Sequence, residues 1–266
     1  MLKIALFTSD SYRHKYIARQ LAQSFDLKLI LTEKKSRKIK QTSQLSVEDK
    51  VFVDRHFKAR EKVERQFFAA YDFPQRATYV SLEHGTINSE EVADLLQKTA
   101  PDYIILFGTS IIKKKILNLF PNRFINLHLG LSPYYKGSAT NIFPYLYNEP
   151  ECVGATIHIA TAEVDAGGIL HQLRPDISLE DSLHSIGNKV ILKAGKELAS
   201  IISTYDTSQS VPVEQKGKGR ICRIQDFSPG VLRQIYAFFD GEGLKEYLNN
   251  KGQRDSLKPI VTVKEE

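Results

Sequence analysis

The chain begins with two short, mostly apolar runs, KIALFT at residues 3–8 and LKLILT at residues 27–32. Apolar runs of this length are typical of strands that are buried on both faces of a sheet. Between them, from Tyr12 to Phe25, the apolar residues recur at helical spacing. A strand–helix–strand order favours a parallel sheet, because parallel neighbours need a crossover connection. This feature points to the α/β class of folds.

The same alternation of strands and helices continues along the chain to residue 205. Further buried strands are predicted at 102–108, 123–128, 153–160 and 167–175. Helices are predicted at 47–70, 90–100, 110–120 and 179–205, with a single helical turn at 140–148. Asn88 and Glu91 have the spacing of a capping box, which marks the start of the helix at 90–100. We therefore expect residues 1–205 to form one doubly wound, Rossmann-like domain with a mostly parallel sheet.

Residues 206–266 have a different character. They contain KGKGR at 216–220, followed by a pattern that predicts two short helices around a Gly-rich turn. A separate domain commonly needs about 100 residues or more. We expect a mostly helical appendage that packs on the core. Its apolar residues can face the core or a second subunit, and we favour a homodimer; they are Leu232, Ile235, Tyr236, Phe238 and Phe239.

The chain of 266 residues carries a net charge of +6, which favours anionic partners in general. Nucleic acid and phosphorylated small molecules both fit that description. The basic residues are scattered, apart from Lys113–Lys115 and a stretch at 34–40 whose role the sequence leaves open. Neither group is interleaved with aromatic residues in the way that RNA-binding motifs require. We interpret both groups as solvated surface and expect no nucleic-acid partner.

Cysteine usage and hydropathy bear on the location of the protein. Cys152 and Cys222 have neither a disulfide nor a metal-ligand spacing, and no His-rich motif indicates a metal site. No apolar run approaches the roughly 18 residues of a membrane helix. The N-terminus lacks the apolar region and cleavage site of a signal peptide. We expect a cytoplasmic protein with no metal and no membrane segment.

The stretch FINLHLGLSPYYKG at residues 124–137 suggests a reactive site. In open α/β sheets, ligands bind beyond the carboxyl ends of the strands, which is where Asn126 and His128 are expected. Side chains two apart on a strand point to the same face. An amide and an imidazole that point together can stabilise a developing oxyanion and move a proton. Pro133 and Gly137 would make the following loop stiff.

A third polar residue follows in EVDAGGIL at residues 163–170. Asp165 is predicted in a loop between two strands, where its carboxylate could orient and charge an imidazole from a neighbouring strand end. Alone, a D-x-G sequence indicates only a turn, and an N-x-H pair is often structural. The combination and its order carry the functional interpretation. His158, which alternates with two isoleucines, is interpreted as a packed or edge histidine, and His84 as a loop residue.

Residues 102–172 resemble the formyltransferases that use 10-formyltetrahydrofolate. That family includes glycinamide ribonucleotide transformylase, the catalytic domain of methionyl-tRNA formyltransferase and the sugar-nucleotide N-formyltransferases. Its N-x-H pattern, Gly-ended loop and D-x-G loop are similar to Asn126–His128, Leu131–Gly137 and Asp165–Gly167 here. The resemblance implies that Asn126 and a protonated His128 stabilise the oxyanion. Asp165 would keep His128 charged and assist proton transfer.

The resemblance also implies a folate pocket between the strand that carries Asn126, the preceding strand end and the Asp165 loop. Contacts there would be made largely through backbone groups in an apolar cleft. The residues concerned are Leu106, Phe107, Gly108, Ile111, Ile112, Ala160, Thr161 and Val164.

The acceptor of the formyl group is inferred from departures from the family pattern. TSDSYRHK at residues 8–15 lacks the Gly-rich phosphate loop of the purine-pathway members, and residues 206–266 lack the barrel of the tRNA enzyme. The remaining similarity favours a nucleotide-linked amino deoxysugar for surface polysaccharide. Candidate substrate contacts are Arg13, His14, Lys15, Tyr134, Tyr135, Lys136 and Gly137.

Three alternatives remain open from the sequence. The acceptor could be another small amine, of the hydroxyornithine or glycinamide ribonucleotide type. Methionyl-tRNA is a less favoured acceptor. A non-catalytic folate or RNA binder is the alternative from another functional class, but mere binding does not require Asn126, His128 and Asp165 together.

Overall fold

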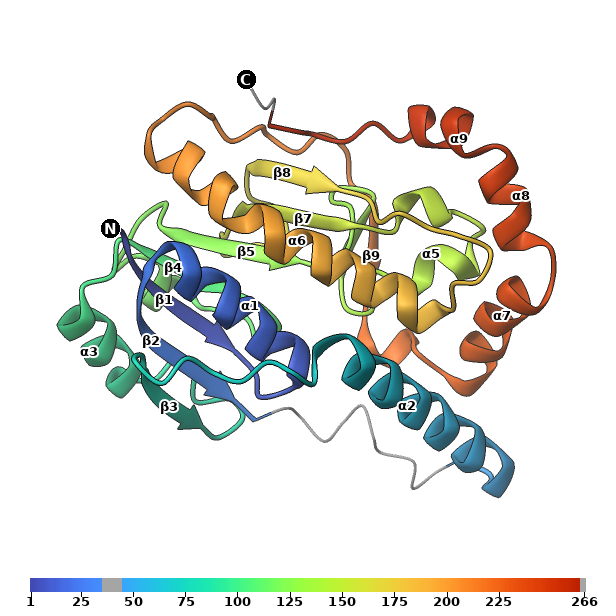
Figure 1. The fold of residues 1–266 in the computed structure, drawn as a ribbon, viewed down its shortest axis with the longest axis horizontal. Helices are drawn as coiled ribbons and strands as arrows, with labels where there is room; N and C mark the ends of the chain where they lie inside the picture. The colour runs from blue at the N-terminus through green and yellow to red at the C-terminus, as the bar shows by residue number, and fades with distance from the viewer. Residues whose placement is uncertain (35–44, 264–266) are drawn as a thin grey trace.

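The computed structural model describes residues 1–34 and 45–263, which form a seven-stranded sheet of order β3-β2-β1-β4-β5-β7-β8 (Figure 1). Its strands are β1 Lys3–Thr8, β2 Asp26–Glu33, β3 Thr78–Leu82, β4 Tyr103–Leu106, β5 Phe124–His128, β7 Ala155–Ile159 and β8 Ile169–Leu173. The pairs from β3 to β5 are parallel, whereas β7 is antiparallel to both β5 and β8. The prediction of an α/β fold with a mostly parallel sheet is confirmed.

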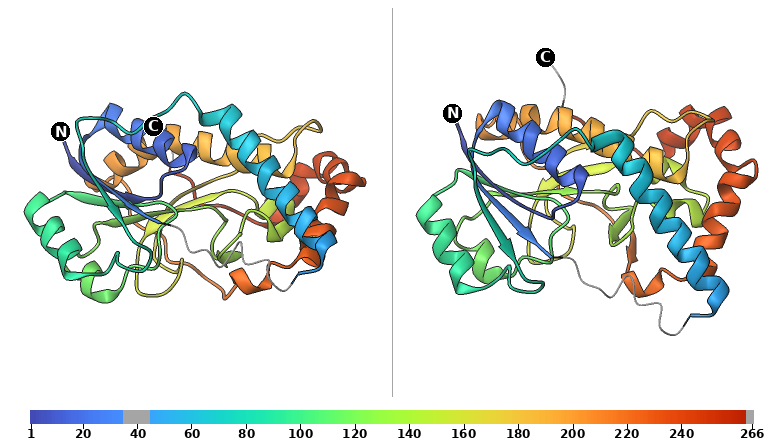
Figure 2. Two further views of the ribbon diagram at one scale, coloured as in Figure 1. Left: turned by 90° about the horizontal axis from the view of Figure 1, so that it is seen from below. Right: turned by 60° about the horizontal axis from the view of Figure 1, so that its bottom comes forward.

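Helices cover both faces of the sheet. They are α1 Tyr12–Ser24, α2 Val47–Phe68, α3 Glu90–Thr99, α4 Lys114–Leu117, α5 Phe143–Leu146, α6 Leu183–Asp206, α7 Pro229–Asp240, α8 Gly243–Asn249 and α9 Lys251–Leu257. Because successive strand residues face opposite sides, Ile4 and Leu6 join the core under α1 and α6, while Ala5 and Phe7 join the core with α3. Figure 2 shows α1, α2 and α6 on one side and α3 on the other.

Two predictions are wrong, the helix at 110–120 and the capping box formed by Asn88 and Glu91. Helix α4 extends only from Lys114 to Leu117, and Ser89 rather than Asn88 is the N-cap residue of α3. The Asn88 amide instead binds the chain before α4, donating to the Ile111 carbonyl at 2.9 Å and accepting from the Lys113 N–H at 2.7 Å. The Asn88 side chain thus forms hydrogen bonds with backbone groups of the non-helical segment before Lys114, and α4 begins only after that segment.

Two features of the sheet were not predicted. Strand β3 lies at an edge, and only Val80 and Leu82 of its five residues are even partly buried, so it has no strong apolar pattern. A separate two-stranded sheet pairs β6 Tyr135–Gly137 with β9 Arg220–Cys222. Strands this short, with partners so far apart in the sequence, leave no periodic signal.

The C-terminal region packs on the core with α7, α8 and α9, one helix more than predicted (Figure 1). Leu232 and Ile235 of α7 are fully buried within the chain. The Tyr145 ring lies 5.2 Å from the Phe238 ring and 4.7 Å from the Phe239 ring, measured between centroids. The apolar face of α7 is therefore covered in large part by its own core.

The basic stretch at 34–40 lies outside the described residues, apart from Lys34. Lys34, which is described, forms an ion pair with Glu83. Across residues 1–34 and 45–263, no helix has both the length and the apolar character needed to cross a membrane. Within the same residues, no three His, Cys, Asp or Glu side chains gather as metal ligands.

Two histidines, the buried His56 and the half-buried His184, join α2, α6 and α7. The Tyr236 hydroxyl lies 3.1 Å from His56 Nδ1 and 3.3 Å from His184 Nε2. Burial, followed by the nearby His184 and Arg60, lowers the pKa of His56 to about 3. Burial and Arg60 likewise lower the pKa of His184 to about 4. Both imidazoles are therefore neutral in the folded protein at neutral pH.

We expect acid to weaken this junction. Below the unfolded-state pKa of about 6.5, the unfolded chain binds protons that the folded protein excludes. The stabilisation is complete above that pH and is lost as the pH falls toward the folded-state pKa of each histidine, about 4 for His184 and about 3 for His56. The expected loss at pH 5 is roughly 1–2 kcal/mol for each histidine.

Urea unfolding at neutral pH and at about pH 5 tests this expectation. His56→Gln should reduce the acid loss by about half, since one of the two histidines is gone. His84→Gln, at an exposed position, is the matched control. An acid loss that is the same in His56→Gln and in the unsubstituted protein would contradict the assignment.

Candidate active site

Asn126 and His128 lie at the carboxyl end of β5, on one face of the strand, as predicted. Their neighbours are fixed by strand register. Leu106 of β4 pairs with Asn126 on one side, and His158 of β7 pairs with Asn126 on the other. Directly opposed residues of an antiparallel pair have adjacent side chains on the same face. The His158 ring therefore belongs to this site.

The Asp165 carboxylate lies between these side chains. One oxygen, Oδ1, accepts from Asn126 Nδ2 at 3.2 Å, and the other, Oδ2, lies 3.3 Å from His128 Nδ1. The Gly137 N–H donates to Oδ2 at 2.8 Å. His158 Nε2 is 3.5 Å from Oδ1 and 3.0 Å from Asn126 Nδ2. The structure thus brings together the three predicted residues, a fourth side chain and one backbone donor.

The turn that carries Asp165 needs its particular residues. Asp165 has φ +48, in the left-handed region that short polar side chains tolerate better than branched ones. A Cβ atom on Gly167 would lie 1.8 Å from the Ile159 carbonyl oxygen, so only glycine fits there. The D-x-G spacing therefore serves both chemistry and backbone geometry.

The 129–137 loop is tied to the sheet. The Ser132 N–H donates to Thr156 Oγ1 at 2.9 Å, and Gln172 Nε2 donates to the Ser132 carbonyl at 2.6 Å. Gly137 has φ +98, which confirms the conformation predicted for it. A Cβ atom on Gly130 would lie 2.7 Å from His128 Nε2, so this glycine leaves room for the His128 ring.

Burial and the neighbouring groups have opposite effects on the pKa values of His128 and Asp165. Burial is the larger effect on His128 and lowers its pKa, although the Asp165 carboxylate acts to raise it. Burial alone would raise the pKa of Asp165, but the charge of His128, together with the hydrogen bond from the Gly137 N–H, outweighs it and lowers the pKa to about 2. Asp165 is therefore ionised at neutral pH.

The hydrogen-bonding pattern of His128 favours its charged form. Nδ1 faces the Asp165 carboxylate, and Nε2 lies 3.3 Å from the Tyr135 carbonyl oxygen, so both ring nitrogens face acceptors. In the neutral ring one of these nitrogens has no hydrogen to donate. A negative charge that develops nearby would add to Asp165 and help His128 to hold a proton.

The predicted folate residues occupy two segments on either side of β5. Leu106, Phe107 and Ile112 are buried, whereas Gly108 and Ile111 are exposed. On the other segment Ala160 is half-buried, and its N–H donates to the Phe124 carbonyl at 2.8 Å; Thr161 and Val164 are exposed.

Ile111 is 64% exposed and Val164 is 45% exposed. These two side chains present apolar surface on the segments that flank β5. An aromatic ring system such as a pterin could cover apolar surface of this kind.

Several predicted substrate residues are engaged elsewhere in the protein. Arg13 is buried and forms an ion pair with Glu64 of α2, and Lys15 Nζ lies 2.7 Å from Asp72 Oδ1. His14 is buried; its Nδ1 lies 2.7 Å from Thr8 Oγ1, and its ring packs on Phe107 with centroids 4.7 Å apart.

The other predicted substrate residues lie in the loop after β5. Tyr135 is buried and donates its hydroxyl hydrogen to Glu149, and Tyr134 donates to the Pro259 carbonyl at 2.8 Å. Gly137 contacts Asp165 directly. Within the described part of the chain, Lys136 makes no ion pair.

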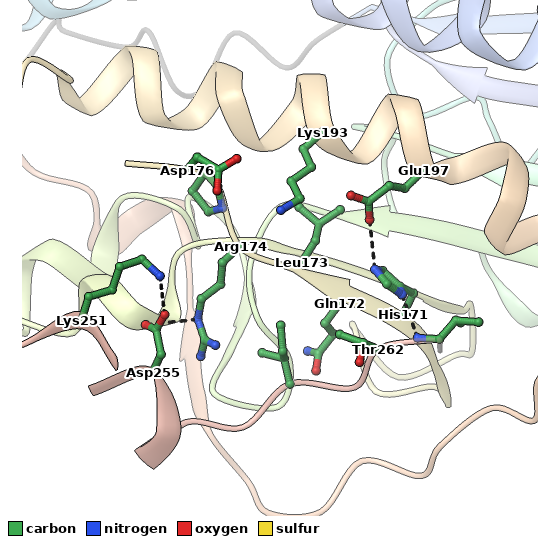
Figure 3. Close-up of a pocket in the computed structure, with 13 residues that line it drawn as sticks. His171, Gln172, Leu173, Arg174, Asp176, Lys193, Glu197, Lys251, Asp255 and Thr262 are labelled. Carbon is green, nitrogen blue, oxygen red and sulfur yellow. Dashed lines mark hydrogen bonds and ion pairs between the residues drawn. The ribbon is translucent and has the colours of Figure 1, made fainter. Parts of the chain in front are cut away.

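A cavity of about 490 Å³ lies apart from these residues, between β8, α6 and the C-terminal segment (Figure 3). Its charged side chains largely pair with one another. His171 Nε2 lies 3.1 Å from Glu197 Oε2, and Asp255 lies 2.5 Å from Lys251 and 3.6 Å from Arg174. None of the residues predicted for the site lines it. The candidate site at the end of β5 is therefore separate from this cavity.

The sequence did not predict His158 as a site residue. It also did not predict that Gln215 contacts the Asp165 backbone. The described structure shows Gln215 Nε2 within 2.8 Å of the Asp165 carbonyl oxygen. The sequence places His158 in a predicted strand. Placing it opposite Asn126 requires the knowledge that β7 is antiparallel to β5. No local pattern marked Gln215.

A family model described as "Formyl transferase" matches residues 6–202. Methionyl-tRNA formyltransferase of Finegoldia magna is 30% identical over 120 residues, which are 45% of this chain and 38% of that protein. The same enzyme of Ehrlichia ruminantium is 25% identical over 170 residues, 58% of this chain and 56% of that protein. The matches thus span about half, or less, of these curated relatives.

Solved structures of low sequence identity share the fold. Glycinamide ribonucleotide transformylase 1 of Symbiobacterium toebii has a TM-score of 0.56 at 16% identity, covering 82% of this chain and 92% of its own. A 4-N formyltransferase of Francisella tularensis has a TM-score of 0.57 at 18% identity, covering 85% and 78%. A sugar N-formyltransferase of a Shewanella species has a TM-score of 0.57 at 17% identity, covering 85% and 78%.

Proposed function

The chain belongs to the formyl transferase family, whose members use 10-formyltetrahydrofolate, and from this premise we propose that it formylates the amine of a nucleotide-linked amino deoxysugar. The formyltransferase activity follows from the family. The acceptor, and its use in surface polysaccharide, are the proposal. The observation that carries the catalytic part is the contact of Asp165 with both Asn126 and His128, at 3.2 and 3.3 Å.

The proposed mechanism assigns one task to each side chain. Bound 10-formyltetrahydrofolate supplies the formyl carbon that the acceptor amine attacks. Asn126 Nδ2 donates a hydrogen bond to the formyl oxygen as that oxygen gains negative charge. His128 would take up the proton that the amine loses and pass it to the folate nitrogen as the bond between that nitrogen and the formyl carbon breaks. Asp165 holds His128 in position through Nδ1 and favours its charged form.

His158 has a supporting place in this scheme. Its Nδ1 lies 2.9 Å from the carbonyl oxygen of Ile159, which is an acceptor, so Nδ1 carries the hydrogen. The other nitrogen, Nε2, is then an acceptor for the Asn126 amide at 3.0 Å. Asn126 thus has both of its hydrogens directed to protein acceptors, Asp165 and His158. One of them must turn to the formyl oxygen during the reaction.

The choice of acceptor is supported by what surrounds the site. The segment after β1, at residues 9–15, contains no glycine and so offers no Gly-rich cradle for a ribose phosphate. The described residues after α6 form helices and one short strand rather than a barrel. Lys136, next to Gly137, remains as a cation for a diphosphate, because Arg13 and Lys15 are paired within the chain.

Turnover against a panel of amines tests the proposal. Purified protein would be given 10-formyltetrahydrofolate with TDP-, UDP- and GDP-linked amino sugars, glycinamide ribonucleotide and hydroxyornithine. Release of tetrahydrofolate with one amino sugar nucleotide is the expected result. Turnover with only glycinamide ribonucleotide or hydroxyornithine would overturn the acceptor assignment and leave the catalytic one intact.

Thermal shift gives an independent check. A ligand that binds only the folded state raises the melting temperature, so TDP, UDP or GDP should stabilise the protein if the acceptor is a nucleotide sugar. Lys136→Ala should reduce that shift, whereas Lys98→Ala, on the exposed side of α3, should leave it unchanged. No stabilisation by any nucleoside diphosphate would count against the sugar-nucleotide acceptor.

A further inference from the structure

The segment Val213–Cys222, here called the strap, returns to the active site after α6 has left it. Figure 1 shows this return as the orange trace from the end of α6 to β9. Val213 forms an antiparallel bridge with Ile169 at the start of β8, with both N–H to carbonyl distances at 2.8 Å. The strap ends in β9, which pairs with β6 beside the catalytic residues. It lies wholly beyond residues 6–202, the region that the family model matches.

Gln215, on the strap, holds the backbone of the Asp165 turn. Its Nε2 lies 2.8 Å from the Asp165 carbonyl oxygen and 2.8 Å from the Gly167 carbonyl oxygen. A side-chain amide has two hydrogens on nitrogen, so both are used. The reversed amide would place its oxygen against two carbonyl oxygens, which fixes the orientation. One side chain thus spans the turn that gives Asp165 its left-handed backbone.

The other end of the strap holds the backbone donor to the Asp165 carboxylate. That donor is the Gly137 N–H, 2.8 Å from Oδ2. The strap fixes the strand around Gly137, because the Arg220 N–H donates to the Tyr134 carbonyl and the Ser138 N–H donates to the Cys222 carbonyl, each at 2.8 Å.

The strap also approaches this loop too closely for a side chain. Gly219 has φ +58, and a Cβ atom there would lie 1.5 Å from the Pro133 carbonyl oxygen. The strap therefore contacts both partners of the Asp165–Gly137 hydrogen bond.

We propose that Gln215 is a positioning residue for Asp165, and that the strap holds the Asp165 carboxylate in register with His128 and Asn126. The inference rests on the proposed catalytic role of Asp165. Loops are less rigid than strands, and a displacement of about 1 Å can cost two orders of magnitude in rate. Asp165 is on a loop, whereas Asn126 and His128 are on a strand, so it is the member of the group that needs an external support.

The test replaces Gln215 with methionine in the full chain, which keeps the length of the side chain and removes both donors. Gln209→Met is the matched control, because Gln209 is exposed and lies in the same connection after α6. We expect kcat for Gln215→Met to fall roughly 10- to 100-fold with little change in KM. Gln209→Met should resemble the unsubstituted protein.

A pH profile separates positioning from a general loss of structure. Asp165 raises the pKa of His128 against the effect of burial. A displaced Asp165 would let that pKa fall, so the pH dependence of kcat should move to lower pH in Gln215→Met. Partial unfolding would lower the amplitude of the profile without moving it. An unshifted profile with unchanged kcat would overturn the proposal.

Hydrogen exchange of the unliganded protein provides a readout that needs no substrate. The amide of Gly137, which donates to Asp165 Oδ2, should exchange faster in Gln215→Met than in Gln209→Met, since the Asp165 turn that holds it is loosened. Equal exchange in the two variants would contradict the strap's role. If Asp165→Asn leaves turnover intact, the catalytic assignment fails instead, and exchange alone then decides whether Gln215 holds the turn.

Discussion

Replacing Asp165 with asparagine is expected to lower kcat roughly 10²- to 10⁴-fold, by analogy with the loss seen when a catalytic carboxylate that orients a histidine is replaced by an amide. Both carboxylate oxygens of Asp165 face donors. Oδ2 faces His128 Nδ1 and the Gly137 N–H, and Oδ1 faces the Asn126 amide. An asparagine amide has only one oxygen, so its NH₂ group must face one of these donors.

The result should be a misdirected His128 in a folded protein. Asp176→Asn is the matched control, because Asp176 is exposed and this substitution removes the same charge at a position away from the site. Single-turnover rates with saturating folate measure the chemical step, and circular dichroism checks the fold. If Asp165→Asn and Asp176→Asn have equal rates, Asp165 does not act on the reaction.

Replacing Asn126 with alanine should lower kcat by about 10²- to 10³-fold, which is the usual effect of removing one oxyanion donor. The amide is held in place before substrate binds, by Asp165 at 3.2 Å and His158 at 3.0 Å. One of these two hydrogens turns to the formyl oxygen as negative charge develops there, and alanine offers no donor at all.

Substrate affinity separates this effect from a damaged pocket. Since the amide acts on the transition state, the dissociation constant of the folate should change little in Asn126→Ala. Asn118→Ala, at the exposed end of α4, is the control for loss of an amide elsewhere. Weakened folate binding with an unchanged single-turnover rate would show that Asn126 is a binding residue rather than an oxyanion donor.

Much of the sheet could be predicted because its signals are local. Apolar runs such as 3–8 and 102–108 have the length and composition of buried strands, and the structure confirms β1 and β4 there. Edge and very short strands escaped prediction for the same reason. Strand β3 is largely exposed, and β6 acquires its strand conformation from a partner, β9, that lies far along the chain.

The candidate site divides in the same way. The common orientation of Asn126 and His128 follows from strand periodicity, and the turn at Asp165 follows from its glycines. The ion pair of Arg13 could not be predicted from the sequence, because its partner Glu64 lies 51 residues away on α2. A basic residue at a helix start is equally able to bind a phosphate or a neighbouring carboxylate, and only the packed structure decides between them.

By itself the sequence determined the α/β class, the order of the main elements and the three residues that we assign to catalysis. These depend on spacing within short segments, where backbone geometry fixes which side chains share a face. The tertiary structure alone decided that β7 runs antiparallel to β5, which places His158 opposite Asn126, and that Gln215 supports Asp165. Such contacts join residues 32 and 50 positions apart, and their formation depends on the packing of the whole chain rather than on any local pattern.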